Sequence, residues 1–142
     1  MSKTEIQFKE VISRCREIFE KKMKDYGTSW RIMRPSSLTD QIYIKAARIR
    51  SLEEKGGVGA VNEGIEPEFI GIVNYCVIAL IQLELGPGDL LTSSEVMELY
   101  DSVITKATSL MMSKNHDYDE AWRMMRISSF TDIISVKELI LI

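Results

Sequence analysis

The segment DYGTSWRIMRPSSLTD, residues 25–40, returns at residues 117–132 as DYDEAWRMMRISSFTD. The two copies lie 92 positions apart and align without a gap. The first copy contains Gly27 and Pro35, and both residue types are unfavourable inside a helix. We therefore predict that the repeated segment is a corner between two helices and that the chain contains this helix–corner–helix unit twice.

Apolar residues at helical spacing predict two helices around the first corner. The first helix is expected from about residue 4 to about residue 24, with Gly27 as its stop signal. A short helical turn is expected at about residues 30–34 and should end at Pro35. The next helix is expected from about residue 38 to about residue 54. Ser36 or Ser37 would cap it, and Asp40 would lie in its first turn, where a carboxylate favours the helix dipole.

The pattern continues through a glycine-rich loop and then restarts. Pro67 suits the first turn of a third helix that ends at about residue 84. Thr92 and Glu95 have the spacing of a capping box, which predicts a fourth helix to about residue 114. Ser129 would cap a last helix that begins near Phe130. No strand-like alternation occurs anywhere, so the predicted fold class is all-α.

The linker LGPGD, residues 85–89, divides the chain into two repeats. We expect a first repeat of three helices at residues 1–86 and a second, shortened repeat at residues 87–142, packed together as one pseudo-symmetric helix bundle. After Lys137 the second copy reads ELILI, where the first reads AARIRSLEE. Such an apolar end needs a cover, which we expect from the first half or from a second subunit, so the prediction is a homo-oligomer.

Composition narrows the class of protein. The chain has 142 residues, 45% hydrophobic and 27% charged, with a net charge of −3. This balance argues against nucleic acid as a partner. The start, MSKTEIQFKE, lacks the apolar core of a signal peptide, and the apolar run FIGIVNYCVIALI is short for a membrane span. Cys15 and Cys76 are predicted to be buried free thiols. We therefore expect a cytoplasmic protein with no membrane partner.

Identities between the two halves are concentrated in the corner. Residues 22–45 keep 13 of 24 identities with residues 114–137, whereas residues 8–21 keep 2 of 14 with residues 100–113. The retained residues are mostly polar, although a fold held only by its core would retain apolar positions. Two interpretations stay open: a stereotyped corner made of caps, aromatic fillers and ion pairs, or a working site in each copy.

The polar groups of the corner suit an anionic ligand. Arg31, Arg34 and Lys45 would gather near a helix N-terminus, whose free N–H groups and dipole attract phosphate. Aromatic rings at Tyr26 and Trp30 could stack on a base or close the core. Carboxylates in the corner could bind magnesium or anchor the arginines.

The motifs KDYGTSW at residues 24–30 and LTDQIYIKAARIRSL at residues 38–52 resemble the nucleotide modification associated domain one family. The resemblance covers about residues 8–84 and, in shortened form, about residues 98–142. It implies a role linked to nucleotide or modified-base metabolism. The helical layout is also similar to the MazG-type all-α nucleoside triphosphate pyrophosphohydrolases. The acidic pattern of that group is incomplete, because Gly71 and Asn74 stand where an inward Asp is wanted.

These observations favour a nucleotide-binding or nucleotide-processing protein, with magnesium-dependent hydrolysis of nucleoside triphosphates as the reaction if it is an enzyme. The alternative is a non-enzymatic helical interaction module. No catalytic residue is assigned. The candidate nucleotide-binding residues are Asp25, Tyr26, Trp30, Arg31, Arg34, Ser37, Asp40, Lys45 and Arg48, with Asp117, Tyr118, Trp122, Arg123, Arg126, Asp132 and Lys137 in the second copy. The candidate Mg²⁺ ligands are Asp25, Asp40, Glu66 and Glu68.

Overall fold

The computed structural model describes residues 2–56 and 64–141, with side chains described up to Ser135. Its elements are α1 (Lys3–Tyr26), η1 (Ser29–Ile32), α2 (Pro35–Glu54), α3 (Ile65–Leu85), α4 (Ser93–Tyr118), η2 (Ala121–Met124) and α5 (Ile127–Leu141), where η marks a 3₁₀-helix. The described residues contain no strand, so the all-α prediction is confirmed.

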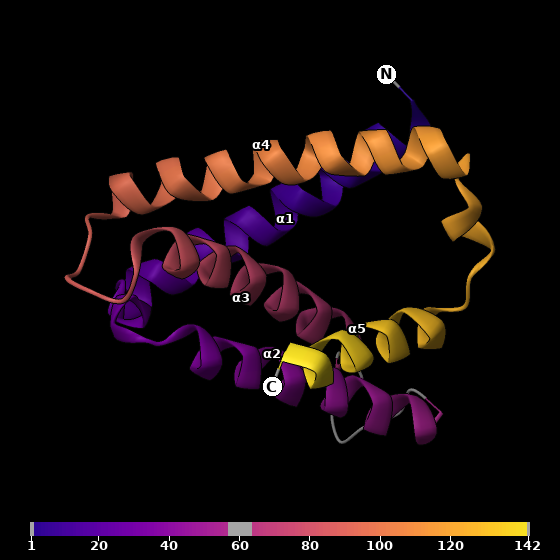
Figure 1. The fold of residues 1–142 in the computed structure, drawn as a ribbon, viewed down its shortest axis with the longest axis horizontal. Coiled ribbons are helices and arrows are strands. Elements are labelled where there is room, and N and C mark those ends of the chain that lie inside the picture. Colours follow the sequence, from indigo (N-terminus) through magenta and orange to yellow (C-terminus); the bar gives the residue numbers. More distant parts are fainter. Residues whose placement is uncertain (1, 57–63, 142) are drawn as a thin grey trace.

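The helices form two layers (Figure 1). The helices α1 and α4 run in opposite directions along one side, and α2, α3 and α5 lie on the other. The helix α2 packs against α3 and α5, while α3 also contacts α1 and α4. Each helix–corner–helix unit therefore contacts its counterpart, α1 with α4 and α2 with α5. The pseudo-symmetry of the two repeats stays a prediction.

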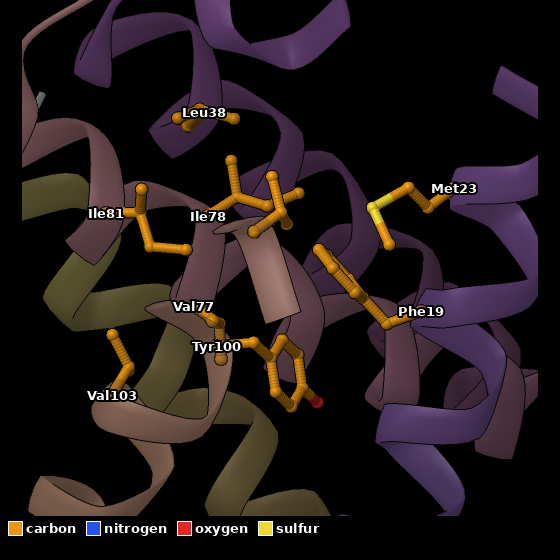
Figure 2. Packing of buried hydrophobic residues seen from close by; sticks show 9 residues of the cluster. Phe19, Met23, Leu38, Val77, Ile78, Ile81, Tyr100 and Val103 are labelled. Carbon is orange, nitrogen blue, oxygen red and sulfur yellow. The ribbon is translucent and has the colours of Figure 1, made fainter. Parts of the chain in front are cut away.

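One apolar core joins the two layers (Figure 2). It contains Phe19, Met23, Leu38, Val77, Ile78, Ile81, Val96, Tyr100 and Val103, which come from α1, α2, α3 and α4. The rings of Phe19 and Tyr100 lie 4.7 Å apart at their centroids and are tilted by 40°. A second cluster, Ile42, Ala46, Ile49 and Ile72, holds α2 against α3. The main core thus draws residues from both sides of the LGPGD linker.

The two corners share their backbone plan and differ in detail. Gly27 ends α1 with a φ of 64°, so the predicted glycine stop is confirmed. Asp119 occupies the equivalent position after α4 and still adopts a positive φ of 51°. Glu120 follows with a φ of 61°. Two successive non-glycine residues in the left-handed region are uncommon and require support from side-chain contacts.

The capping predictions were right for α4 and wrong for α2 and α5. Thr92 and Glu95 form the complete capping box of α4. The helix α2 begins at Pro35, so Ser36 and Ser37 lie inside its first turn, and Asp40 lies beyond that turn. Proline is well suited to the first helical position because it lacks the N–H that would have no partner there. Likewise, α5 begins at Ile127, two residues before Ser129.

The helix α3 is long and apolar enough to cross a membrane by length and composition alone. However, 44% of its most apolar stretch is buried inside the bundle. Its polar side chains Asn74 and Gln82 are buried too, and both are hydrogen-bonded. These are the features of a core helix in a folded domain.

Candidate functional site

Arg31 is buried, and its guanidinium faces the C-terminal end of α3. Only 5% of the residue is exposed. Its N–H groups donate to the side-chain oxygen of Gln82, to the carbonyl oxygen of Gly86 at 2.9 Å and to that of Asp89 at 3.3 Å. Helix C-termini carry partial negative charge and carbonyl groups without intrahelical partners. Arg31 therefore fixes the first corner and the LGPGD linker to α3.

Gln82 completes this arrangement from the other side. Its amide nitrogen donates to the carbonyl oxygens of Arg31 at 2.9 Å and Met33 at 2.7 Å, and more weakly to that of Trp30 at 3.3 Å. The backbone N–H of Gly88 also donates to the carbonyl oxygen of Arg31, at 2.9 Å. Gln82 thus adds side-chain donors to the carbonyl groups of η1 and of Met33 that follows it, and so ties the first corner to α3.

The other polar residues of the first corner lie at the surface. Asp25 is exposed at the end of α1, and Asp40 is exposed on α2. Arg34 is exposed and occupies the N-cap position of α2, where its carbonyl oxygen accepts from the backbone N–H of Ser37 at 3.0 Å. None of these side chains has a hydrogen bond or ion pair among the described residues. The corner therefore does not gather Arg31 and Arg34 around one helix N-terminus.

Lys45 and Arg48 share one carboxylate. The Nζ atom of Lys45 lies 3.2 Å from Glu68, and the Nε atom of Arg48 lies 3.3 Å from the other oxygen of the same side chain. Lys45 also lies over the ring of Tyr75, 5.7 Å from its centroid. Its stem covers Gly71, where an added Cβ would come within 2.8 Å of it. Gly71 thus lets α2 and α3 approach with a lysine between them.

The four predicted magnesium ligands do not form a cluster with other carboxylates. Glu68 has both oxygens in ion pairs, and Glu66 pairs with Arg14 at 3.1 Å. Within residues 2–56 and 64–135, no three His, Cys, Asp or Glu side chains come together in a way that could hold a metal ion. The arrangement therefore offers no ready Mg²⁺ site, and the magnesium prediction stays a prediction.

A cleft of about 560 Å³ opens between α1, η1 and α3. Its walls include the aromatic side chains of Phe19, Tyr26, Trp30 and Tyr75, and its rim carries the cationic side chains of Arg14 and Lys22. Both cations are exposed, and Tyr26 is 76% exposed. Ligand pockets commonly have volumes of about 300–1,000 Å³ and mostly apolar walls with a few polar groups. We call this space the first cleft.

The predicted residues of the second corner are mostly exposed. Four of them are exposed: Asp117 and Tyr118 at the end of α4, Arg126 just before α5, and Asp132 on α5. The side chain of Lys137 lies outside the described side chains. Trp122 is 40% exposed, and its indole N–H donates to the side-chain oxygen of Asn115 at 3.1 Å. The second corner is thus more open than the first.

Arg123 has a different role from its counterpart Arg31. Its guanidinium lies over the Trp122 ring, 4.5 Å from the centroid, and its Nε donates to Glu120 at 3.0 Å. Its Nη2 donates to the hydroxyl of Thr4 at 2.9 Å, and this hydroxyl donates to Glu120. The network joins η2 to the start of α1, two elements more than a hundred residues apart in the chain.

Acid is expected to loosen this network. The hydrogen bond from Thr4, and then that from Arg123, hold the pKa of Glu120 below its usual range. A lowered folded-state pKa means that the contribution to stability is present above the usual glutamate pKa of about 4.3 and is lost as the pH falls through the lower folded value. We expect the emission of Trp122 to change in acid in a protein carrying Trp30→Phe. Adding Glu120→Gln should remove that change, and a persistent transition would contradict the assignment.

Sequence reasoning missed Arg14 on α1 and the α3 side of the first cleft. Arg14, Asn74, Tyr75 and Gln82 are absent from the predicted site, although Asn74 and Tyr75 line the cleft and Gln82 fixes its corner. One signal was available for two of them. A Gln and an Asn inside the most apolar helix of the chain must have hydrogen-bond partners.

The fold and the cleft define an all-α bundle with a ligand-sized, aromatic-walled space beside a repeated corner. The sequence profile of the nucleotide modification associated domain 1 family matches residues 22–83 and 114–139, more than half of the chain. This chain therefore belongs to that family. The two matched ranges begin at Lys22 and Lys114, which are 92 positions apart, so both copies of the corner are matched.

Further comparisons add nothing to this assignment. Searches of curated proteins and of solved structures gave no match. The family match agrees with the first of the two resemblances seen in the sequence. The similarity to MazG-type pyrophosphohydrolases is not supported by these comparisons.

Proposed function

We propose that the first cleft binds a nucleotide. The observation that carries this proposal is the combination of an aromatic wall and a cationic rim in one cleft of about 560 Å³. Most of the residues that line it lie in the segment that the family profile matches, although Arg14 and Phe19 precede that segment. The base would enter between the rings, and the phosphate would remain at the rim, where water can reach it.

The base would meet Trp30, Tyr75 and Tyr26. Trp30 packs partly against the main core, so its ring has a fixed position. Tyr75 is also partly buried, and the ammonium group of Lys45 lies over its ring. A ring that is already ordered loses little entropy when a base stacks on it, and base–aromatic stacking tolerates any base. Tyr26 is exposed and could close over the ligand.

The phosphate would meet Arg14 and Lys22. These residues lie on α1, eight positions apart, and both line the cleft. Arg14 already pairs with Glu66 at 3.1 Å, but both side chains are more than 60% exposed. Exposed pairs of this kind are worth only about 0–1 kcal/mol. A phosphate could therefore replace the carboxylate as the partner of Arg14 at little cost.

We propose binding and assign no hydrolytic step. Arg48 and Lys45 occupy the oxygens of Glu68, so a magnesium ion there would have to displace two cations. Nucleotide binding with and without Mg²⁺ separates the possibilities. If magnesium is part of the site, triphosphate binding should depend on it, and release of pyrophosphate then becomes the assay.

The experiment is a thermal-shift panel of nucleoside mono-, di- and triphosphates, each with and without Mg²⁺, followed by calorimetric titration of any hit. A ligand at a hundred times its dissociation constant should add about 2.7 kcal/mol. For a domain of this size that is a rise of several degrees, roughly 5–10 °C. No shift with any nucleotide would refute the proposal.

The repeat provides a matched control. Lys22→Ala should weaken the binding of a nucleoside monophosphate by roughly tenfold, because a charge-assisted contact to phosphate is lost. Lys114→Ala removes the equivalent lysine from the second copy and should leave this affinity unchanged. Both lysines are exposed, so neither change should unfold the protein. Equal effects of the two substitutions would contradict the placement of the phosphate.

A second candidate function, an interaction module, is favoured by the surface near η2. Met124 is 89% exposed and Ile127 is 65% exposed. Met124 ends η2 and Ile127 begins α5, three positions later, and exposed apolar surface of this kind often marks an interface. If a second copy of the chain covers them, light scattering should give a dimer, and a double change of Met124 and Ile127 to Ser should convert it to a monomer. A monomer of the unchanged protein at all concentrations would exclude a second copy of the chain as the partner of this surface.

A further inference from the structure

A second cleft of about 660 Å³ lies between the start of α1 and the end of α4 with η2. The second corner and its preceding helix contribute seven residues to it: Met111, Lys114, Asn115, Tyr118, Ala121, Trp122 and Met125. Each of the seven lies 92 positions after a residue that lines the first cleft. The two clefts are therefore built by equivalent positions of the two repeats.

The opposite walls of the two clefts are not equivalent. In the first cleft the opposite wall is α3, including Gly71, Asn74 and Tyr75. In the second cleft it is the first turns of α1, with Thr4, Gln7, Phe8 and Val11. The repeated half of each cleft thus meets a different helix. Equivalent sites with different partners can bind related ligands with different preferences.

Trp122 is held in place as one wall of the second cleft. Asn115 accepts from its indole N–H at 3.1 Å, and Arg123 covers one face of the ring at 4.5 Å. Arg123 is itself fixed by Glu120 and Thr4. An indole that is ordered before the ligand arrives is a favourable stacking surface for a planar ring.

The charges at the two rims point to different ligands. The first cleft has two cations at its rim, Arg14 and Lys22, whereas the second has Lys114 alone. The surface that lines the second cleft is almost entirely apolar, and the amide of Asn115 is already hydrogen-bonded to the indole of Trp122. An apolar lining with a single cation suits the face of a planar ring better than it suits a phosphate.

We propose that the second cleft is a separate binding site for an unphosphorylated nucleobase or nucleoside, with the base stacked on Trp122. The choice of nucleotide chemistry rests on the function proposed for the first cleft, but the existence of the site rests on its own geometry. Fluorine NMR of the intact protein tests the two separately. The chain has two tryptophans, so 5-fluorotryptophan labelling gives one signal for each cleft.

The labelled protein is titrated with adenosine, guanosine, cytidine and uridine, and then with their monophosphates. At least one nucleoside should shift the Trp122 signal saturably, and its monophosphate should bind there no more tightly. The Trp30 signal should respond to the monophosphate at lower concentration than to the nucleoside. Trp30→Phe and Trp122→Phe assign the signals.

The equivalent tyrosines provide matched variants. Tyr118→Ala should raise the dissociation constant measured at Trp122 by about tenfold, since a wall of the second cleft is lost. Tyr26→Ala should leave that constant unchanged and weaken the response of Trp30. Both tyrosines are exposed, at 66% and 76%, so both variants are expected to fold.

Each outcome has a definite meaning. A Trp122 signal that no nucleoside shifts, or whose shift is unaffected by Tyr118→Ala, overturns the second site even if the Trp30 signal responds. If the Trp122 signal shifts with the concentration of the protein and not with that of the nucleoside, the second cleft is a contact between copies of the chain. This result also overturns the proposal. A response at Trp122 with none at Trp30 supports the second site and refutes the function proposed for the first.

Discussion

Replacing Arg31 with alanine is expected to lower the free energy of unfolding by roughly 3 kcal/mol. The substitution removes the donors to Gln82, Gly86 and Asp89, and it leaves the buried side-chain oxygen of Gln82 and the partly buried carbonyl oxygen of Gly86 without this partner. For a domain of this size the melting temperature should fall by about 10 °C. Arg31→Lys should recover only part of the loss, because a single ammonium cannot reproduce the fork of a guanidinium.

Arg123→Ala is the matched control. Arg123 stands at the same place in the repeat, but 27% of its side chain and 35% of that of its acceptor Glu120 are exposed. Its other acceptor, the buried hydroxyl of Thr4, keeps Glu120 as a partner when Arg123 is removed. We expect a loss of no more than about 1 kcal/mol. Thermal melts of the three variants decide the question. An Arg31→Ala protein that melts like the unchanged protein but no longer binds nucleotide would show that Arg31 serves the ligand and not the fold.

Replacing Tyr100 with alanine is expected to cost about 3–5 kcal/mol. Tyr100 is completely buried, and its ring packs on Phe19 in the core (Figure 2). Its hydroxyl donates to the side-chain oxygen of Asn74 at 2.9 Å, and Asn74 donates to the carbonyl oxygen of Cys15 at 3.1 Å. Tyr100→Phe keeps the ring and removes one donor, so it should cost about 1–3 kcal/mol. Equal losses in the two variants would show that the ring contributes nothing.

The same residue makes stability sensitive to alkali. Burial raises the pKa of Tyr100 above its ordinary value. In the unfolded chain a tyrosine loses its proton near pH 10, whereas the folded protein keeps it, so stability is full below about pH 10 and falls as the pH rises above that value. Chemical denaturation at a series of alkaline pH values should show this decline, and Tyr100→Phe should flatten it. An undiminished decline in the variant would assign it to other groups.

The helices could be predicted from the sequence because periodicity and stop signals act locally. Gly27 and the capping box of Thr92 and Glu95 were read correctly, since each depends on residues within one turn. The start of α2 was misjudged because two signals competed there. Serine is a favoured cap, but Pro35 can itself open the helix and places the serines inside it.

The candidate site was harder to predict because residues at equivalent positions of the two copies contact different side chains. Arg31 and Arg123 have similar sequence contexts, SWRIMRP and AWRMMRI, yet Arg31 faces Gln82 in the core and Arg123 covers Trp122 at the surface. Gln82, the partner of Arg31, is 51 residues away in the sequence, whereas Trp122, the partner of Arg123, is the preceding residue. Only the packing of α3 against the first corner distinguishes them, and no local pattern reports it. Tyr26 and Trp30 could be proposed as site residues from the sequence, because aromatic rings beside polar groups suggest stacking on a ligand even when their neighbours in the fold are not known.

The helix α1 belongs to both clefts. Its first turns line the second cleft and its remaining length lines the first, as one continuous rod from Lys3 to Tyr26. A rigid rod cannot tilt at one end and stay still at the other. If both clefts bind ligands and α1 moves as one body, a ligand in one cleft would bias the position of a wall of the other, and this bias would be reciprocal in binding free energy. The two copies of the corner thus form two ligand-sized clefts that share one helix, α1.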